Sequence, residues 1–289
     1  MAGPSLCYAY PPCQIYTTEA FGGVHPDGGS PAITNEPTFG SPLARASHPM
    51  PGTPGVGLVL DAYGGLHPYG TPAVTPSQYP YYPGVDIARD FVFASATGGY
   101  ELDGYGGIHP FSVNGGALPA APVNYPYFTG NDVARKIVLL ADGKDGYVLD
   151  IHGGIHPWAA SGGTLPVAPA QYGYWAGANV ARDVWVDPAA TIAGASGYVL
   201  DLYGGFHAFW GGTAAAPAAI VNYPYWAGSD LARAFWFSPG SMPSASFGYV
   251  LDAYGGIHPF AGSGQALPPP IFPFGYWNGR DLARALFGG

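Results

Sequence analysis

Residues 248–260 have the sequence GYVLDAYGGIHPF, in which two apolar segments flank a Gly-Gly pair. The first segment, YVLD, is rich in residues that favour strands, and the two glycines suit a tight turn with positive φ. The segment IHPF follows as a second strand. The sequence therefore predicts a β-hairpin that carries an acid, Asp252, before the turn and a histidine, His258, after it.

This hairpin recurs six times along the chain. The histidines of the Gly-Gly-x-His word lie 42, 42, 47, 51 and 51 residues apart, and an acid precedes each Gly-Gly pair by three residues. The histidines are His25, His67, His109, His156, His207 and His258, and the acids are Glu19, Asp61, Asp103, Asp150, Asp201 and Asp252. A drifting period of this kind is typical of a fixed structural unit with loops of variable length.

Six equivalent acid–histidine pairs favour a structural role over an acid–base or metal site, because a catalytic site needs one asymmetric assembly. We expect each acid to accept hydrogen bonds from the amides of its turn, and each histidine to be packed within its strand. A ring of six imidazoles that binds a metal or an anion is the alternative.

A second repeated word, Ala-Arg, also occurs six times. Its arginines are Arg45, Arg89, Arg135, Arg182, Arg233 and Arg284. The residue three positions before the arginine is usually an acid or an amide, as in Asp86, Asp132, Asn179, Asp230 and Asp281, with Pro42 as the exception. In a chain with only 9% charged residues, these arginines predict an ion pair with an aspartate that locks each repeat, and ligand contact is the alternative.

One repeat can be followed from Ala-Arg onwards. An apolar strand such as AFWF (234–237) or KIVLL (136–140) leads to the YVLD–Gly-Gly–IHPF hairpin. A proline-rich stretch, expected at an outer sheet edge, then leads to an aromatic word and to GSDLAR (228–233), for which we expect one helical turn capped by the aspartate. Repeats of about 40 to 50 residues with three or four short strands are typical of β-propellers.

The two ends of the chain carry complementary halves of a repeat. The hairpin QIYTTEAFGGVHP (14–26) has no Ala-Arg strand before it, and the strand ARALFGG (283–289) has no hairpin after it. Pairing these halves would remove open sheet edges. The sequence therefore predicts a single all-β domain over residues 1–289, a six-bladed β-propeller whose closing blade combines residues of about 1–31 with 284–289. A straight β-solenoid is the alternative.

The order of strand, ADGKDG (141–146), YVLD, turn and IHPW resembles the repeat of β-propellers of the NHL type. The wording GYVLDAYGGIHPF is also similar to repeats of poorly characterised bacterial and phage-associated proteins. This resemblance implies the propeller fold over nearly the whole chain. The nearest functional analogy is to propeller lectins, although one fold hosts many functions.

Composition excludes several partners. The chain has 46 Gly and 32 Pro but 48% hydrophobic residues, which indicates a folded, turn-rich protein. The net charge is −9 and Lys136 and Lys144 are the only lysines, so nucleic acid is not an expected partner. We find no apolar run long enough for a membrane span and no signal-peptide pattern, and we expect no membrane insertion.

The remaining chemistry-bearing residues are few. Cys7 and Cys13 are a disulfide candidate and have no further ligands nearby for a metal. No nucleophile elbow, phosphate loop or catalytic constellation is found, and His152 and Ala208 are the only departures from the repeat near the turns. The sequence therefore predicts a non-enzyme without metal or cofactor.

The aromatic words are the strongest binding candidates. Their equivalent members are Tyr82, Phe128, Trp175, Trp226 and Trp277, preceded by Tyr81, Tyr127, Tyr174, Tyr225 and Tyr276. Aromatic faces beside polar groups suit sugar rings, although aromatics of this kind also fill the space between neighbouring blades. We expect a multivalent module, extracellular or on a virion, that recognises glycans or a surface protein through pockets between blades. The alternative is a structural subunit of an extracellular or virion assembly, or a homo-oligomer.

Overall fold

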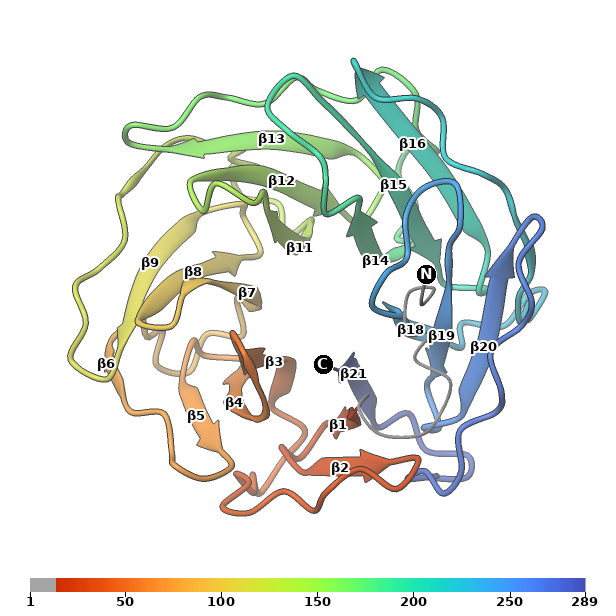
Figure 1. The fold of residues 1–289 in the computed structure, drawn as a ribbon. Coiled ribbons are helices and arrows are strands. Elements are labelled where there is room, and N and C mark those ends of the chain that lie inside the picture. The colour runs from red at the N-terminus through yellow and green to blue at the C-terminus, as the bar shows by residue number, and fades with distance from the viewer. Residues whose placement is uncertain (1–13, 289) are drawn as a thin grey trace, which may run out of the picture.

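The computed structural model describes residues 14–288, which form 21 β-strands and no helix. The strands belong to six antiparallel sheets, and Figure 1 shows these sheets one after another around a central axis. Among the described residues there is no helix that could cross a membrane. The all-β class expected from the sequence is confirmed, whereas Cys7 and Cys13 lie outside the described residues.

The strands follow the chain from one sheet to the next. The first sheet combines the first two described strands with the last one and contains β1 (Ile15–Glu19), β2 (Val24–Asp27) and β21 (Ala283–Gly288). The next two contain β3 (Ala44–Met50), β4 (Thr53–Asp61) and β5 (Leu66–Tyr69), and β6 (Pro76–Gln78), β7 (Ala88–Ser95), β8 (Gly98–Asp103) and β9 (Ile108–Val113). The fourth contains β10 (Pro122–Asn124), β11 (Ala134–Leu139), β12 (Asp145–Asp150) and β13 (Ile155–Ala160). The last two contain β14 (Ala181–Val186), β15 (Gly194–Asp201) and β16 (Phe206–Gly212), and β17 (Ile220–Asn222), β18 (Ala232–Phe237), β19 (Phe247–Asp252) and β20 (Ile257–Gly262).

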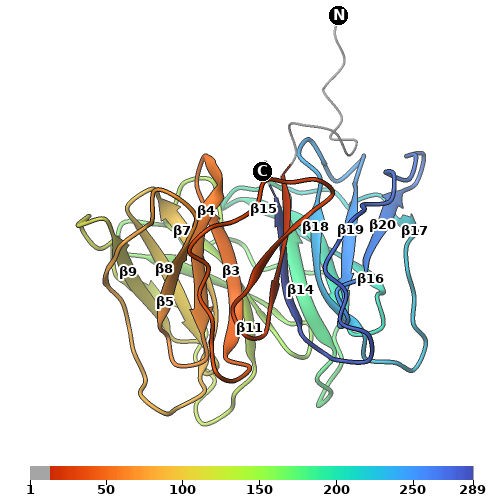
Figure 2. The same ribbon diagram turned by 90° about the horizontal axis from the view of Figure 1, so that it is seen from below.

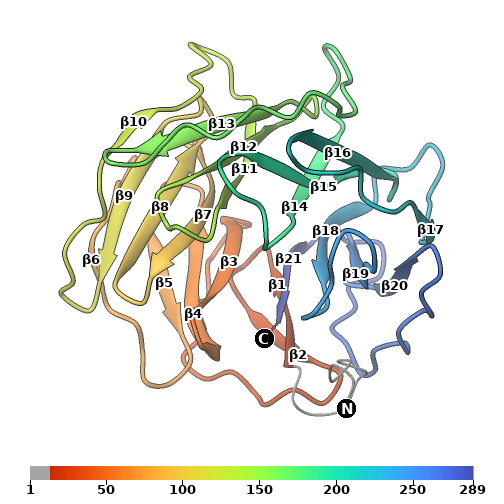
Figure 3. The same ribbon diagram turned by 45° about the horizontal axis from the view of Figure 1, so that its top comes forward.

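Every sheet has the same internal order. The Ala-Arg strand forms one edge and lies nearest the central axis, the YVLD-type strand pairs with it, and the histidine strand comes next. Three sheets add a short outer strand, β6, β10 or β17, at the periphery (Figure 3). Two of these begin with a proline, Pro76 or Pro122, which an outer edge tolerates because one side of the strand needs no ladder partner.

The first and the last described strands pair with each other. Strand β1 lies antiparallel to β21, with Tyr16 opposite Phe287 and Thr17 opposite Leu286, and β2 pairs with the other side of β1. The two complementary half-repeats therefore lie in one sheet, as the sequence predicted.

The apolar core is divided into six clusters, and each cluster joins side chains of two sheets. In one of them Phe235 and Phe237 of β18 pack with Tyr198 and Leu200 of β15. Through these clusters every sheet packs against two others. The sheet of β1, β2 and β21, for example, packs against the sheet of β3–β5 on one side and the sheet of β17–β20 on the other. Figure 2 shows these sheets from the side. Burial between sheets, rather than within one layer, thus holds the repeats together.

One local expectation is wrong. Residues 228–233 contain no helical turn. Instead the N–H of Ser229 donates to the carbonyl of Trp226 (3.0 Å) in a tight turn, and β18 begins at Ala232. The carboxylate of Asp230 binds arginines and caps no helix.

The hairpin turn has the geometry that its sequence predicts. Asp252 Oδ1 accepts hydrogen bonds from the N–H groups of Tyr254 and Gly256 at 2.8 and 2.9 Å, and Oδ2 lies 2.8 Å from His258 Nε2. Gly255 has a φ of 92°, which disfavours any residue with a Cβ. The same three contacts recur in the hairpins of Asp61, Asp103, Asp150 and Asp201.

Replacing Asp252 tests this arrangement. Asp252→Ala leaves two turn amides and the imidazole without their acceptor, and we expect unfolding free energy to fall by about 2–4 kcal/mol. Asp252→Asn retains Oδ1 and should cost about 1 kcal/mol. Urea unfolding of both variants checks this, and equal losses would show that the carboxylate does not hold the turn through these bonds.

Candidate functional site

The half-buried aromatics of the repeat pack against the next sheet. Six edge-on aromatic contacts, with ring centroids 4.6–5.8 Å apart, join Phe39 to His67, Tyr82 to His109, Phe128 to His156, Trp175 to His207, Trp226 to His258 and Trp277 to His25. The histidines lie on the third strand of each sheet and not at the central axis. The aromatic rings therefore fill the junctions between sheets. Phe39 occupies the same place in the first repeat as Tyr82, Phe128, Trp175, Trp226 and Trp277 do in the others, although the sequence around it did not indicate this.

The tyrosines that precede these rings are exposed. Tyr81, Tyr127, Tyr174, Tyr225 and Tyr276 have exposed fractions of 54–59%. In four repeats a further exposed tyrosine stands two residues earlier, and an exposed Gln or Asn precedes it. These four sets, called here the tyrosine sites, are Gln78/Tyr79/Tyr81, Asn124/Tyr125/Tyr127, Gln171/Tyr172/Tyr174 and Asn222/Tyr223/Tyr225. Each set offers two aromatic faces and one amide to the solvent.

The arginines join neighbouring sheets. Arg89 of β7 binds Asp86, three residues before it, and also Asp132, which leads into β11 of the next sheet. Arg233 makes the same double contact with Asp230 (2.8 Å) and Asp281 (2.7 Å). The partners are therefore aspartates of an expected class. One contact of each of these two arginines stays within its own repeat, as expected, and the other reaches the loop of the next repeat.

All six arginines line one cavity together. A space of about 470 Å³ is lined by all six of them together with Lys136, Asn179, Asp230, Asp281 and Pro42. The guanidinium groups are mostly buried, whereas their aspartate partners are about half exposed. We call this cavity the arginine mouth.

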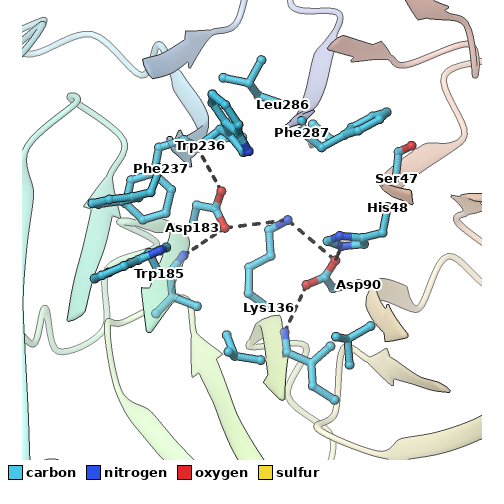
Figure 4. A pocket seen from close by; sticks show the side chains of 18 of the residues that line it. Ser47, His48, Asp90, Lys136, Asp183, Trp185, Trp236, Phe237, Leu286 and Phe287 are labelled. Atoms are coloured by element: carbon cyan, nitrogen blue, oxygen red, sulfur yellow. Dashed lines mark hydrogen bonds and ion pairs between the residues drawn. The ribbon is translucent and has the colours of Figure 1, made fainter. Parts of the chain in front are cut away.

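A second cavity, of about 370 Å³, contains an asymmetric charged cluster (Figure 4). Lys136 Nζ of β11 lies 3.7 Å from Asp90 Oδ1 of β7 and 3.9 Å from Asp183 Oδ1 of β14, and His48 Nε2 lies 3.2 Å from Asp90. Although burial disfavours the ammonium, the two carboxylates raise the pKa of Lys136. Because Lys136 lines both cavities, this cluster separates the arginine mouth from the more apolar space beside Trp185 and Trp236.

Asp90 and Asp183 also bind the backbone of the neighbouring inner strands. Asp90 accepts a hydrogen bond from Ile137 N–H of β11 and Asp183 accepts one from Phe235 N–H of β18, both at 3.1 Å. The cluster therefore ties β7, β11, β14 and β18 together around the axis.

This cluster was missed from the sequence, although a signal was present. The residue after each Ala-Arg is Ala46, Asp90, Lys136, Asp183, Ala234 or Ala285. This position is alanine in three repeats and charged in the other three. Aligning the six Ala-Arg motifs would therefore have revealed that the repeats differ here. The departures that the sequence did single out make no such cluster: His152 Nδ1 lies 2.8 Å from the carbonyl of Ala178, and Ala208 stands opposite Tyr198.

Glu101 is a second missed departure, where YELD replaces YVLD. Its side chain is fully buried in β8, and neither carboxyl oxygen has a hydrogen-bond partner among the described residues. Burial raises the pKa of Glu101 to about 9, and the charges of Asp61 and Asp103 act in the same direction. The carboxyl is therefore protonated at neutral pH. The hydroxyl of Tyr82, which replaces Trp or Phe of other repeats, is likewise buried without a partner in the described part of the chain.

Comparison with known protein families and with curated proteins finds no relative of this chain. No protein-family model matches the chain, and no curated protein matches it. Within residues 14–288, no three His, Cys, Asp or Glu side chains form a group that could hold a metal ion.

Removing the central cation should expose the two carboxylates to mutual repulsion. Lys136→Met leaves Asp90 and Asp183 buried without their shared cation, and we expect a loss of about 3–5 kcal/mol in unfolding free energy. The triple variant with Asp90→Asn and Asp183→Asn should recover most of this loss. Equal stability of Lys136→Met and the parent protein in urea unfolding would contradict the ion cluster.

The pKa of Glu101 predicts a pH dependence. Because the folded value of about 9 exceeds the ordinary value of 4.5, the native state is favoured at low pH and loses stability as pH rises between these values. Glu101→Val, which restores the residue of most other repeats, should remove this dependence and increase stability at pH 7 by about 3 kcal/mol. Asp27 and Asp145, whose pKa values are raised to about 6, titrate in both proteins, so the difference between parent and variant is the quantity to measure. Parallel stability curves between pH 5 and 9 would refute the assignment.

Proposed function

We propose that the six sheets are the blades of a six-bladed β-propeller that forms a single domain and is closed by β1 and β21. The support is the cyclic series of apolar clusters, in which the sheet from the two chain ends packs against a sheet on either side. A straight β-solenoid would leave its first and last repeats apart, and thus fits this packing poorly.

We further propose that the protein is a non-catalytic, multivalent binding module that recognises glycans through the four tyrosine sites. The observation that carries the proposal is the repeated exposure of two tyrosines beside an amide, at equivalent places in four repeats. Tyrosine faces cover the apolar face of a sugar ring, and an adjacent Gln or Asn can bond its hydroxyls. The sites differ from the pockets expected between the blades, because the half-buried rings there already contact histidines.

Packing supports the rigidity that such sites need. Tyr225 is followed directly by Trp226, whose ring is held against His258 of the next sheet. Tyr223 and Tyr225 are oriented edge to face, with ring centroids 6.5 Å apart. A rigid aromatic surface loses little conformational entropy on binding, and several weak copies gain apparent affinity when a ligand spans them.

A glycan array tests the proposal with variants of the tyrosine sites. Tyr225→Ala should weaken binding of a multivalent glycan several-fold, and the combined Tyr81→Ala, Tyr127→Ala, Tyr174→Ala and Tyr225→Ala variant should lose it, by about 100-fold or more. Phe272→Ala is the matched control, because Phe272 is 70% exposed but its repeat has no amide at the equivalent place. Absence of any bound glycan for the parent protein would refute this function.

The second candidate is a structural subunit of an extracellular or virion assembly. Exposed aromatics such as Phe272 and Tyr127 also suit contact with another protein, since aromatic residues are enriched at interfaces. Sedimentation at increasing concentration separates the two proposals. A parent protein that binds no glycan and associates through residues of the tyrosine sites would favour assembly, either with itself or with a surface protein.

A further inference from the structure

The chain of ion pairs around the arginine mouth has two interruptions. Six arginines face four aspartates, namely Asp86, Asp132, Asp230 and Asp281, because the equivalent position holds Asn179 in one repeat and Pro42 in another. Pro42 precedes β3 and Asn179 precedes β14, three repeats later, and Figure 1 shows these two strands on opposite sides of the central axis.

The interruption at Asn179 leaves two guanidiniums on one neutral oxygen. Arg135 Nη2 and Arg182 Nη1 both donate to Asn179 Oδ1, at 2.8 and 3.0 Å. Arg182 also reaches Asp230 at 2.8 Å, whereas Arg135 makes no salt bridge among the described residues. Most other repeats have an aspartate at this position. The amide oxygen of Asn179 carries less negative charge than such a carboxylate and balances the two guanidinium groups less well.

Arg135 is the least satisfied of the six arginines. Its Nε is buried and has no hydrogen-bond partner in the described part of the chain. Burial lowers the pKa of Arg135 to about 10, and the positive charges of Arg182 and Arg89 act in the same direction. A planar guanidinium with free donors, held in place beside a second one, suits the oxygens of phosphate or carboxylate groups.

We propose that the arginine mouth binds a small oxyanion, carrying phosphate or carboxylate groups, at Arg135, Arg182 and Asn179. The anion supplies the negative charge that the repeat lacks at position 179, accepts from Arg135 Nη1, which makes no hydrogen bond among the described residues, and lies in the cavity of about 470 Å³. Asn179 is exposed, so the site is open to solvent. The cluster of Lys136 with Asp90 and Asp183 forms the inner limit of the site. This inference is independent of the glycan proposal, because no residue of the tyrosine sites lines the cavity.

The variant Asn179→Asp tests the site by completing the chain of ion pairs. Its carboxylate would occupy the place of the anion's charge between Arg135 and Arg182, and should repel the anion. Asn131→Asp is the matched control, because Asn131 is exposed, belongs to the equivalent loop of the preceding repeat and lies outside the cavity lining. Both variants change the net charge by the same amount.

Calorimetric titration with inorganic pyrophosphate and with citrate, at low ionic strength, gives the readout. We expect the parent protein and Asn131→Asp to bind at least one of the two anions, and Asn179→Asp to bind it about tenfold more weakly or not at all. The better ligand of the two distinguishes a phosphate from a carboxylate specificity. Arg135→Lys, which keeps the charge but loses the planar fork, should also weaken binding about tenfold.

Two results would overturn the proposal. One is the absence of binding of either anion to the parent protein at millimolar concentrations, and the other is undiminished binding to Asn179→Asp. Thermal unfolding of each variant without ligand shows whether it is folded, and we expect Asn179→Asp to be at least as stable as the parent, since it adds a negative charge between two guanidinium groups. Should that variant fail to fold, Arg135→Lys decides: undiminished anion binding by this variant would overturn the site.

Discussion

Each sheet of this protein is joined to the next by an aromatic ring that packs against a histidine, and the histidine is in most repeats fixed by the aspartate that holds its own hairpin turn. In the last complete example, Asp252 binds two turn amides and His258, and Trp226 of the preceding repeat packs on that imidazole. One carboxylate thus sets both the local fold of a hairpin and the position of its neighbour. Repeating this contact around the axis fixes the relative orientation of all six sheets, and the cavities at the axis depend on it.

Much of this arrangement could be predicted because it is repeated. The acid, the Gly-Gly pair and the histidine recur at fixed spacing, so the hairpin and the turn-holding role of Asp252 followed from pattern alone. The pairing of β1 with β21 followed from the complementary half-repeats at the two ends. By contrast, which sheet an arginine contacts depends on distances between neighbouring loops, and no spacing along one repeat contains that information. The repeated aromatic motifs similarly predicted which residue types lie together. Which of these side chains are exposed and which are packed depends on the neighbouring sheet and could not be predicted from one repeat.

The charged interior was harder to predict, because it departs from the repeat. Asp90, Lys136 and Asp183 replace small residues within short strands that otherwise read as apolar, and each looks isolated in its own repeat. They meet only because their strands all lie at the axis. Glu101 is similar, since a single Val-to-Glu difference in a hairpin gives no hint that the side chain is enclosed by the adjacent sheet. Repeated residues therefore describe the scaffold, and the asymmetric ones describe what is particular to this chain.

The ion pairs at the arginine mouth do not join all six sheets in the same way. Asp86 and Asp132 join Arg45 and Arg89 in one continuous series of ion pairs. Asp230 and Asp281 join Arg182, Arg233 and Arg284 in a second series. The two series are separated by Asn179 and by Pro42, which replace the aspartate of the other repeats. At the position of Asn179, however, Lys136 and Asp183 still join β11 to β14. The ion pairs between inner strands of the described residues therefore form an open series from β3 to β21. The remaining junction, at Pro42, is joined by other contacts, such as the packing of Tyr16 and Phe287 with Tyr69.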